Sequence, residues 1–110
     1  TLTGKYLGGQ MPQGSRLALF GDGPLMMRYK GDKTQQAIEM YVNLAKKYEI
    51  DPAQLAIQFC NIQPFVTSTI IGATTMEQLK TCIDSVDLDI TKEIMNEIRG
   101  IHKEIPNPAP

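Results

Sequence analysis

The feature that most limits how this chain can fold is one β-branched stretch, residues 65–71, with no second convincing stretch of its kind. The sequence Phe-Val-Thr-Ser-Thr-Ile-Ile predicts a buried strand. A strand must pair, because its backbone N–H and C=O groups cannot be buried without hydrogen-bond partners. The partner strands are therefore expected to lie outside this chain or to come from another copy of it.

This predicted strand leads directly into a predicted helix. Gly72 is placed for a tight turn, and Thr74 for a helix cap with Glu77 at the third position. A helix that begins after a strand presents unpaired backbone N–H groups and the positive end of its dipole, which together suit phosphate. Residues 72–78 are therefore a candidate anion site; the alternative is an ordinary strand-to-helix connection.

Apolar residues at helical spacing predict most of the remaining structure. The predicted helices cover residues 33–48, 52–62, 75–85 and 91–103. Asp32 and Gln35 are placed as a capping box for the first, and Asp51 precedes a proline at the start of the second. The second helix is apolar apart from one narrow polar stripe, which predicts burial on more than one side. The stripe consists of Gln54, Gln58 and Asn61.

Residues 1–31 are rich in glycine and are predicted to be irregular. A structureless run of this length is unusual within a compact domain. Lys5 and Arg16 are its candidate binding residues, because lysine offers phosphate a point charge and arginine a bidentate fork. The alternative is that both are solvated loop charges.

Composition excludes several classes of function. The 110 residues carry a net charge of −1, so bulk charge does not attract nucleic acid. No apolar run approaches the ~20 residues that span a membrane, and no signal peptide is evident, so we expect a cytoplasmic location. Cys60 and Cys82 form no CxxC pair; two reduced thiols are favoured over one disulfide. His102 fits a role at a helix C-terminus.

The order helix, helix, strand, helix is that of an interrupted α/β fold. The chain alone is predicted to be mostly α-helical with one short strand. Because a complete (β/α)₈ barrel takes ~250 residues, the chain is expected to be the last part of one. It begins with Thr1 rather than Met, which predicts a processed chain or a piece of a longer one.

Four segments resemble the aldo-keto reductases, in particular bacterial members related to the potassium-channel β-subunits. They are 2–6 (LTGKY), 14–16 (GSR), 51–57 (DPAQLAI) and 68–79 (STIIGATTMEQL). The resemblance covers essentially the whole chain and implies the C-terminal part of a (β/α)₈ TIM barrel. It implies residues 1–32 as the loop after strand 7, 33–62 as helices, 65–71 as strand 8, 75–85 as helix 8 and 91–103 as the C-terminal helix.

The resemblance also implies a binding site for NADPH in the parent protein. Lys5 and Arg16 match the cations near the adenosine 2′-phosphate. Gly72 and Thr74 match the turn that receives this end of the cofactor, and Gln78 matches a residue beside the ribose. Thr81 and Cys82 stand where many members have Glu and Asn contacting adenine. The adenine contacts at residues 81 and 82 therefore depart from the family pattern. At residue 82, a thiol cannot replace the two-way hydrogen bonding of an amide.

The chemistry implied by the resemblance is hydride transfer from NADPH to an aldehyde or ketone, with a tyrosine as general acid. None of the chain's tyrosines matches that residue, so the isolated chain is predicted to lack the catalytic set and to be inactive. Its expected partners are NADP(H), a small carbonyl substrate for the parent protein, and further copies of itself through the unpaired strand. The alternative is a non-enzymatic interaction module, with residues 17–32 as its contact surface.

Overall fold

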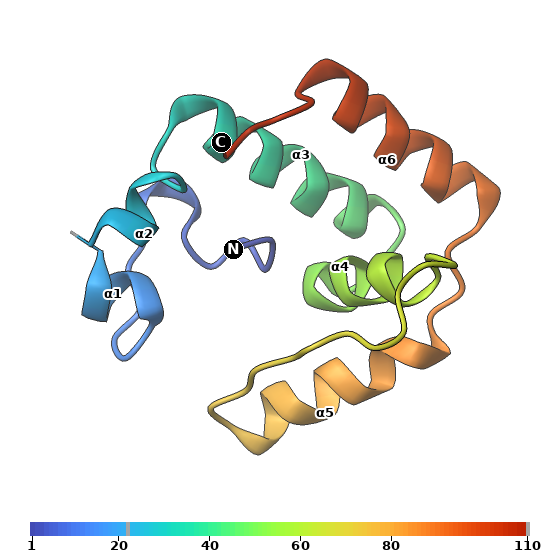
Figure 1. The fold of residues 1–110 in the computed structure, drawn as a ribbon, viewed down its shortest axis with the longest axis horizontal. Coiled ribbons are helices and arrows are strands. Elements are labelled where there is room, and N and C mark those ends of the chain that lie inside the picture. Colours follow the sequence, from blue (N-terminus) through green and yellow to red (C-terminus); the bar gives the residue numbers. More distant parts are fainter. Residues whose placement is uncertain (22, 110) are drawn as a thin grey trace.

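The computed structural model describes residues 1–21 and 23–109, and these residues form an arrangement of helices with no strand (Figure 1). In chain order the elements are η1 (Leu7–Gly9), α1 (Arg16–Phe20), α2 (Pro24–Met27), α3 (Asp32–Lys47), α4 (Pro52–Asn61), α5 (Met76–Asp84), η2 (Ser85–Asp87) and α6 (Lys92–Glu104). α3 packs against α6 and α4, and α4 packs against α5 and η2. None of the described helices has the length and apolar character needed to cross a membrane.

The prediction of a strand over residues 65–71 is wrong. This segment is a coil between α4 and α5 (Figure 1), and its Phe65 and Ile70 side chains are 82% and 97% exposed. Its β propensity comes from its side chains, but a strand also needs a neighbouring strand, and the described part of the chain offers none. A mostly helical chain without strands fits a part of a larger α/β fold.

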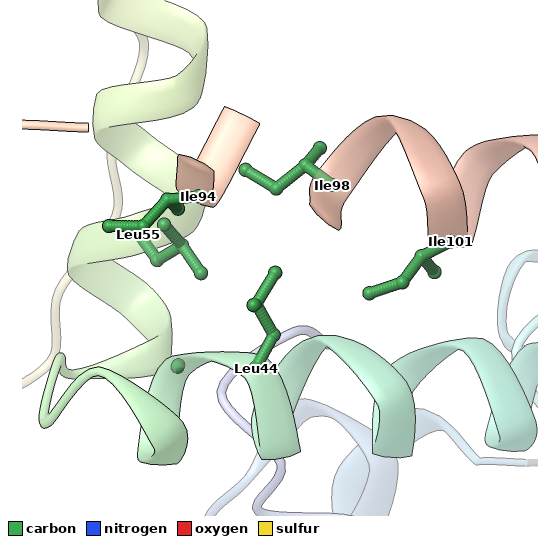
Figure 2. Packing of buried hydrophobic residues seen from close by; sticks show 6 residues of the cluster. Leu44, Leu55, Ile94, Ile98 and Ile101 are labelled. Atoms are coloured by element: carbon green, nitrogen blue, oxygen red, sulfur yellow. The ribbon is translucent and has the colours of Figure 1, made fainter. Parts of the chain in front are cut away.

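The core lies where α3, α4 and α6 meet. On α6 the residues Ile94, Ile98 and Ile101 recur at helical spacing and are 3–9% exposed. Figure 2 shows Ile101 directed toward α3 and Ile98 directed toward Ile94, with Leu44 rising from α3 below them. The predicted apolar faces of these helices therefore do form the core, whose buried cluster is Leu44, Ala45, Leu55, Ile94, Ile98 and Ile101.

Local capping explains where two of these helices begin. The Asp51 carboxylate accepts hydrogen bonds from the N–H groups of Ala53 (2.7 Å) and Gln54 (3.1 Å), which confirms the predicted start of α4. The capping box predicted for Asp32 is wrong. Gly31 is the N-cap of α3, and the Gln35 amide donates instead to the Tyr29 carbonyl at 2.8 Å.

The polar stripe of α4 faces α5 and η2. The Gln54 side-chain amide donates to the Thr81 carbonyl (3.2 Å), and that of Gln58 donates to the Leu88 carbonyl (3.0 Å). α3 covers another side of α4, so the predicted burial on more than one side is confirmed. The stripe supplies the hydrogen bonds that fasten the second half of the chain to the core.

The opening segment is more regular than predicted. It contains η1, α1 and α2, because Ser15 caps α1 by accepting from the Ala18 N–H (3.3 Å) and Pro24 occupies the first turn of α2. Gly4 has φ +76°, and a Cβ there would lie 2.9 Å from a methyl of Val42. The conformation and the close approach both require glycine at this position, where the opening segment meets α3.

A surface cluster joins the end of α3 to α6. Lys47 Nζ lies 2.7 Å from Glu97 Oε1, and the Tyr48 hydroxyl donates to the same oxygen. Hydrogen bonds from Lys47 and Tyr48 lower the pKa of Glu97, and the hydrogen bond to Glu97 raises the pKa of Tyr48. The cluster therefore favours an ionised Glu97 in the folded chain.

Replacing Glu97 with Gln is expected to lower the urea midpoint at pH 7. A carboxylate whose pKa is lowered by folding stabilises the fold above its unfolded pKa, and this contribution is lost as pH falls through its folded pKa. The difference between Glu97→Gln and the parent chain should therefore shrink in acid. Glu39→Gln, on the exposed surface of α3, is the control. Equal midpoints at pH 7 would contradict the expectation.

Candidate functional site

The structure places the predicted site residues in two groups on separate elements. The first group is Lys5, before η1, and Arg16, at the start of α1. The second lies just before α5 and on it: Gly72, Thr74, Gln78, Thr81 and Cys82. α1 and the start of α5 both lie in the left half of Figure 1. Within residues 1–21 and 23–109, no hydrogen bond or ion pair joins the first group to the second.

The start of α5 is organised by its own side chains. Thr75 is the N-cap, and its hydroxyl accepts from the Gln78 N–H at 3.1 Å. Gln78 Oε1 in turn accepts from the Thr74 N–H (3.0 Å) and hydroxyl (3.1 Å). The predicted cap was Thr74 with Glu77 three residues on; the observed arrangement is shifted by one residue. Two successive threonines offer the same hydroxyl: Thr75 accepts from the Gln78 backbone N–H, while Thr74 hydrogen-bonds the Gln78 side chain.

This arrangement leaves backbone donors open. The N–H groups of Thr75, Met76 and Glu77 have no acceptor in the described part of the chain, and all three residues are exposed. Together with the helix dipole, these N–H groups can bind an anion. The carboxylate of Glu77, in the first turn of α5, opposes this binding. Further positive charge is needed for a site of useful affinity.

The tight turn predicted at Gly72 is absent. Its φ lies outside the left-handed region, and a Cβ at this position would meet no atom within 4 Å. The chain bends instead at residues 74 and 75, where the cap forms. The space beside Gly72 is therefore open, which leaves room for a bound group.

Thr81 and Cys82 take part in packing within the chain. The Thr81 hydroxyl donates to the Glu77 carbonyl (3.1 Å), and the Cys82 carbonyl accepts from the Ser85 hydroxyl (2.7 Å). Cys82 and Cys60 are half-buried free thiols. Neither residue 81 nor residue 82 offers the carboxylate or amide that would suit adenine.

Tyr6 organises the cationic group, a role that the sequence alone did not indicate. Lys5 Nζ lies 5.1 Å from the centre of the Tyr6 ring, and the Leu17 N–H donates to the Tyr6 hydroxyl at 3.4 Å. Burial acts to raise the pKa of Tyr6, but the Leu17 N–H, Ser15 and Lys5 together lower the pKa. Tyr6 thus holds Lys5 close to the first turn of α1, where Arg16 lines a cavity of about 160 Å³.

A larger apolar cavity, of about 460 Å³, lies among α3, α4 and α6. Tyr41 and His102 line it, and burial raises the pKa of Tyr41. None of the predicted site residues lines this cavity.

Residues 1–103 match the family model described as the aldo/keto reductase family. The chain belongs to the aldo/keto reductase family. It is 47% identical over 110 residues to the protein tas of Escherichia coli, covering all of this chain and 31% of that protein. It is 36% identical over 105 residues to an aldo-keto reductase of Babesia bovis (92% of this chain, 36% of that protein).

A third aldo/keto reductase relative is a probable voltage-gated potassium channel subunit beta of Oryza sativa, 33% identical over 107 residues (96% of this chain, 33% of that protein). The chain thus spans about a third of the length of these relatives. Family membership implies a (β/α)₈ barrel parent, and the strandless, mostly helical chain fits a partial piece of that barrel.

Proposed function

We propose that this chain is the NADP(H)-binding C-terminal part of a cytoplasmic aldo-keto reductase, which as a whole protein reduces aldehydes or ketones. The start of α5 carries the proposal, because its N–H groups are open while its cap is complete. In the parent barrel, residues 1–32 form the loop after strand 7 and residues 33–62 the helices that follow it. Residues 65–71 take the place of strand 8, 75–85 form helix 8, and 91–103 form the C-terminal helix.

The residues present fit the phosphate end of NADPH better than its adenine. An adenosine 2′-phosphate suits the bidentate guanidinium of Arg16, the ammonium of Lys5 and the open N–H groups of α5. The Gln78 NH₂ group donates no hydrogen bond within the described chain, so it is available to a ribose hydroxyl. When bound, NADPH supplies the hydride; the residues of this chain hold its phosphate end.

The chain by itself is proposed to be inactive as a reductase. Three of its four tyrosines have other roles: Tyr6 positions Lys5, Tyr48 binds Glu97, and Tyr41 lines the apolar cavity. The carbonyl substrate would therefore meet catalytic groups from the rest of the parent barrel.

Arg16→Ala is expected to weaken the binding of 2′,5′-ADP by about 10–100-fold, the loss typical of a charge-assisted hydrogen bond to a phosphate. Titration calorimetry of the 110-residue chain measures this. Added salt should weaken the parent chain's binding, and 5′-ADP, which lacks the 2′-phosphate, should bind less tightly. Arg99→Ala is the matched control, because Arg99 is an exposed arginine on α6.

Three results would count against this proposal. The first is equal affinity of Arg16→Ala and the parent chain. The second is equal affinity for 5′-ADP and 2′,5′-ADP. The third is the absence of binding by either nucleotide or by NADPH, which would favour the second candidate below.

The second candidate is a non-enzymatic interaction module on the same fold. It is favoured by the apolar side chains that α1 and α2 present to solvent: Leu19, Phe20 and Met27 are 58–63% exposed. An exposed apolar patch of this kind marks an interaction surface. The relative named as a potassium channel subunit beta gives a precedent for a partner protein. On this hypothesis, nucleotide binding is absent and substitutions in the patch weaken partner binding.

A further inference from the structure

Residues 105–109, which follow α6, form a strap that turns back to the start of α3 (Figure 1). The strap is fastened at two points. Ile105 is buried, and its N–H donates to the Ile101 carbonyl at 2.9 Å. The Pro108 carbonyl accepts from the hydroxyl of Thr34, in the first turn of α3. The two residues between these points are exposed, so the strap is held by its ends.

The Thr34 hydroxyl also reaches the connection between α2 and α3, because it donates to the Arg28 carbonyl at 3.1 Å. A hydroxyl has one hydrogen, so the Arg28 and Pro108 carbonyls share it. Thr34 is only 4% exposed, so water competes little for this hydrogen. The next side chain acts on the same connection: the Gln35 amide donates to the Tyr29 carbonyl at 2.8 Å. Two successive residues of α3 thus hold the connection, and one of them also holds the strap.

The connection between α2 and α3 forms part of the wall of the smaller cavity, of about 160 Å³, that Arg16 lines. Tyr29 and Gln35 both line this cavity together with Arg16. A continuous series of contacts therefore runs from the strap, through Thr34 and the connection, to the cavity. The whole series lies within this chain.

We infer that the strap fixes this cavity wall and that Thr34 is the positioning residue that couples the two. The inference rests on the proposed function, in which Arg16 binds the 2′-phosphate of NADP(H). A wall that is already ordered before the phosphate arrives reduces the entropy lost on binding. Two of the five residues of the strap are proline, whose fixed φ leaves less backbone freedom to lose. Thr34 is buried, so it acts through the connection and does not touch the cofactor.

Titration calorimetry of the 110-residue chain with 2′,5′-ADP tests the coupling. Thr34→Val keeps the side-chain shape and removes the hydroxyl. It is expected to weaken binding by about three- to tenfold, the loss typical of one hydrogen bond. Thr34→Ser keeps the hydroxyl and should restore most of the affinity. Thr91→Val is the matched control: it removes the cap that accepts from the Ile94 N–H (3.3 Å) and should lower stability without changing the affinity.

Deletion of residues 108–110 tests whether the strap acts through Thr34. The deletion removes the Pro108 carbonyl and opens the Thr34 hydroxyl to water, so it should also weaken binding of 2′,5′-ADP. Because both changes act on one hydroxyl, the deletion combined with Thr34→Val should bind no more weakly than Thr34→Val alone. Losses that add in the combined variant would show that the strap and Thr34 act separately.

A measurement on the chain without nucleotide follows the wall directly. Heteronuclear NOE values report the order of backbone amides on the picosecond-to-nanosecond timescale. The amides of residues 29–31, in the connection, and of Asn107, in the strap, should be ordered in the parent chain. Thr34→Val should loosen both groups, while the amides of α4 stay unchanged.

The outcomes separate this inference from the proposed function. If the parent chain binds 2′,5′-ADP, equal affinity of Thr34→Val, a loss that Thr34→Ser does not restore, or additive losses would overturn the inference and leave the proposed function in place. A parent chain that binds neither 2′,5′-ADP nor NADPH would remove the proposed function, and with it the part of Thr34 in cofactor binding. The NOE values then decide the rest: amides of residues 29–31 that stay equally ordered in Thr34→Val would show that the strap does not fix the wall.

Discussion

Replacing Ile94 with alanine is expected to lower the free energy of unfolding by about 2–5 kcal/mol, the usual range for deleting a large aliphatic side chain from a core. Ile94 is 3% exposed and packs in the cluster that contains Leu44 and Leu55 (Figure 2). The cost combines lost apolar burial with the cavity left behind, because three helices converge at this position. Urea unfolding followed by helical circular dichroism measures the change.

Ile70→Ala is the matched control for this prediction. It makes the same chemical change at a side chain that is 97% exposed, so it should alter the stability of the monomer by less than about 0.5 kcal/mol. The comparison is made in dilute solution, so that any self-association at residues 65–71 does not contribute. Similar losses for the two substitutions would contradict a core located where α3, α4 and α6 meet.

The long helices could be predicted closely because their signals are local. The predicted helices over 33–48, 52–62 and 91–103 correspond to α3, α4 and α6, each within about one residue at either end. Apolar spacing marks the buried face, and Asp51 and Thr91 cap their helices through contacts within three residues in sequence. Asp32 shows the limit of this reasoning, since a residue suited to capping lies inside α3 instead.

The strand could not be predicted correctly because its formation depends on residues far from it. Side chains alone favoured a strand at 65–71, but the described chain provides no neighbour to accept its N–H groups. The fold class of the parent could still be recognised, because the motifs of the aldo/keto reductase family lie in short continuous stretches.

The candidate site also has one part that local sequence determines and another that depends on distant residues. The capped start of α5 depends on residues 74–78, so the presence of a threonine cap could be predicted from the sequence, apart from which threonine serves. Whether Lys5 and Arg16 approach α5 depends on long-range packing that no local pattern encodes. The two groups have no hydrogen bond or ion pair between them among the described residues, and their assignment to one phosphate remains a prediction.

Replacing Gln58 with Glu is expected to lower the free energy of unfolding by about 3 kcal/mol at pH 7, because a buried donor is replaced by a charged acceptor. Gln58 is 8% exposed. Its NH₂ group donates to the carbonyls of Leu88 (3.0 Å) and Val86 (3.5 Å), while its oxygen accepts from Asn61 (3.2 Å). A carboxylate would turn negative oxygen toward two carbonyl oxygens and detach α4 from the segment that follows α5.

The loss caused by Gln58→Glu should depend on pH with a defined sign. When the introduced carboxyl group is protonated, it regains an O–H that can donate to a carbonyl, so the folded variant would bind this proton more tightly than the unfolded variant does. The deficit should therefore shrink as pH falls through the carboxyl range and be largest above it. Gln36→Glu makes the same change on the exposed surface of α3 and should cost less than about 0.5 kcal/mol. A small and pH-independent loss for Gln58→Glu would show that packing alone, rather than the polar stripe of α4, holds α5 and η2 to the core.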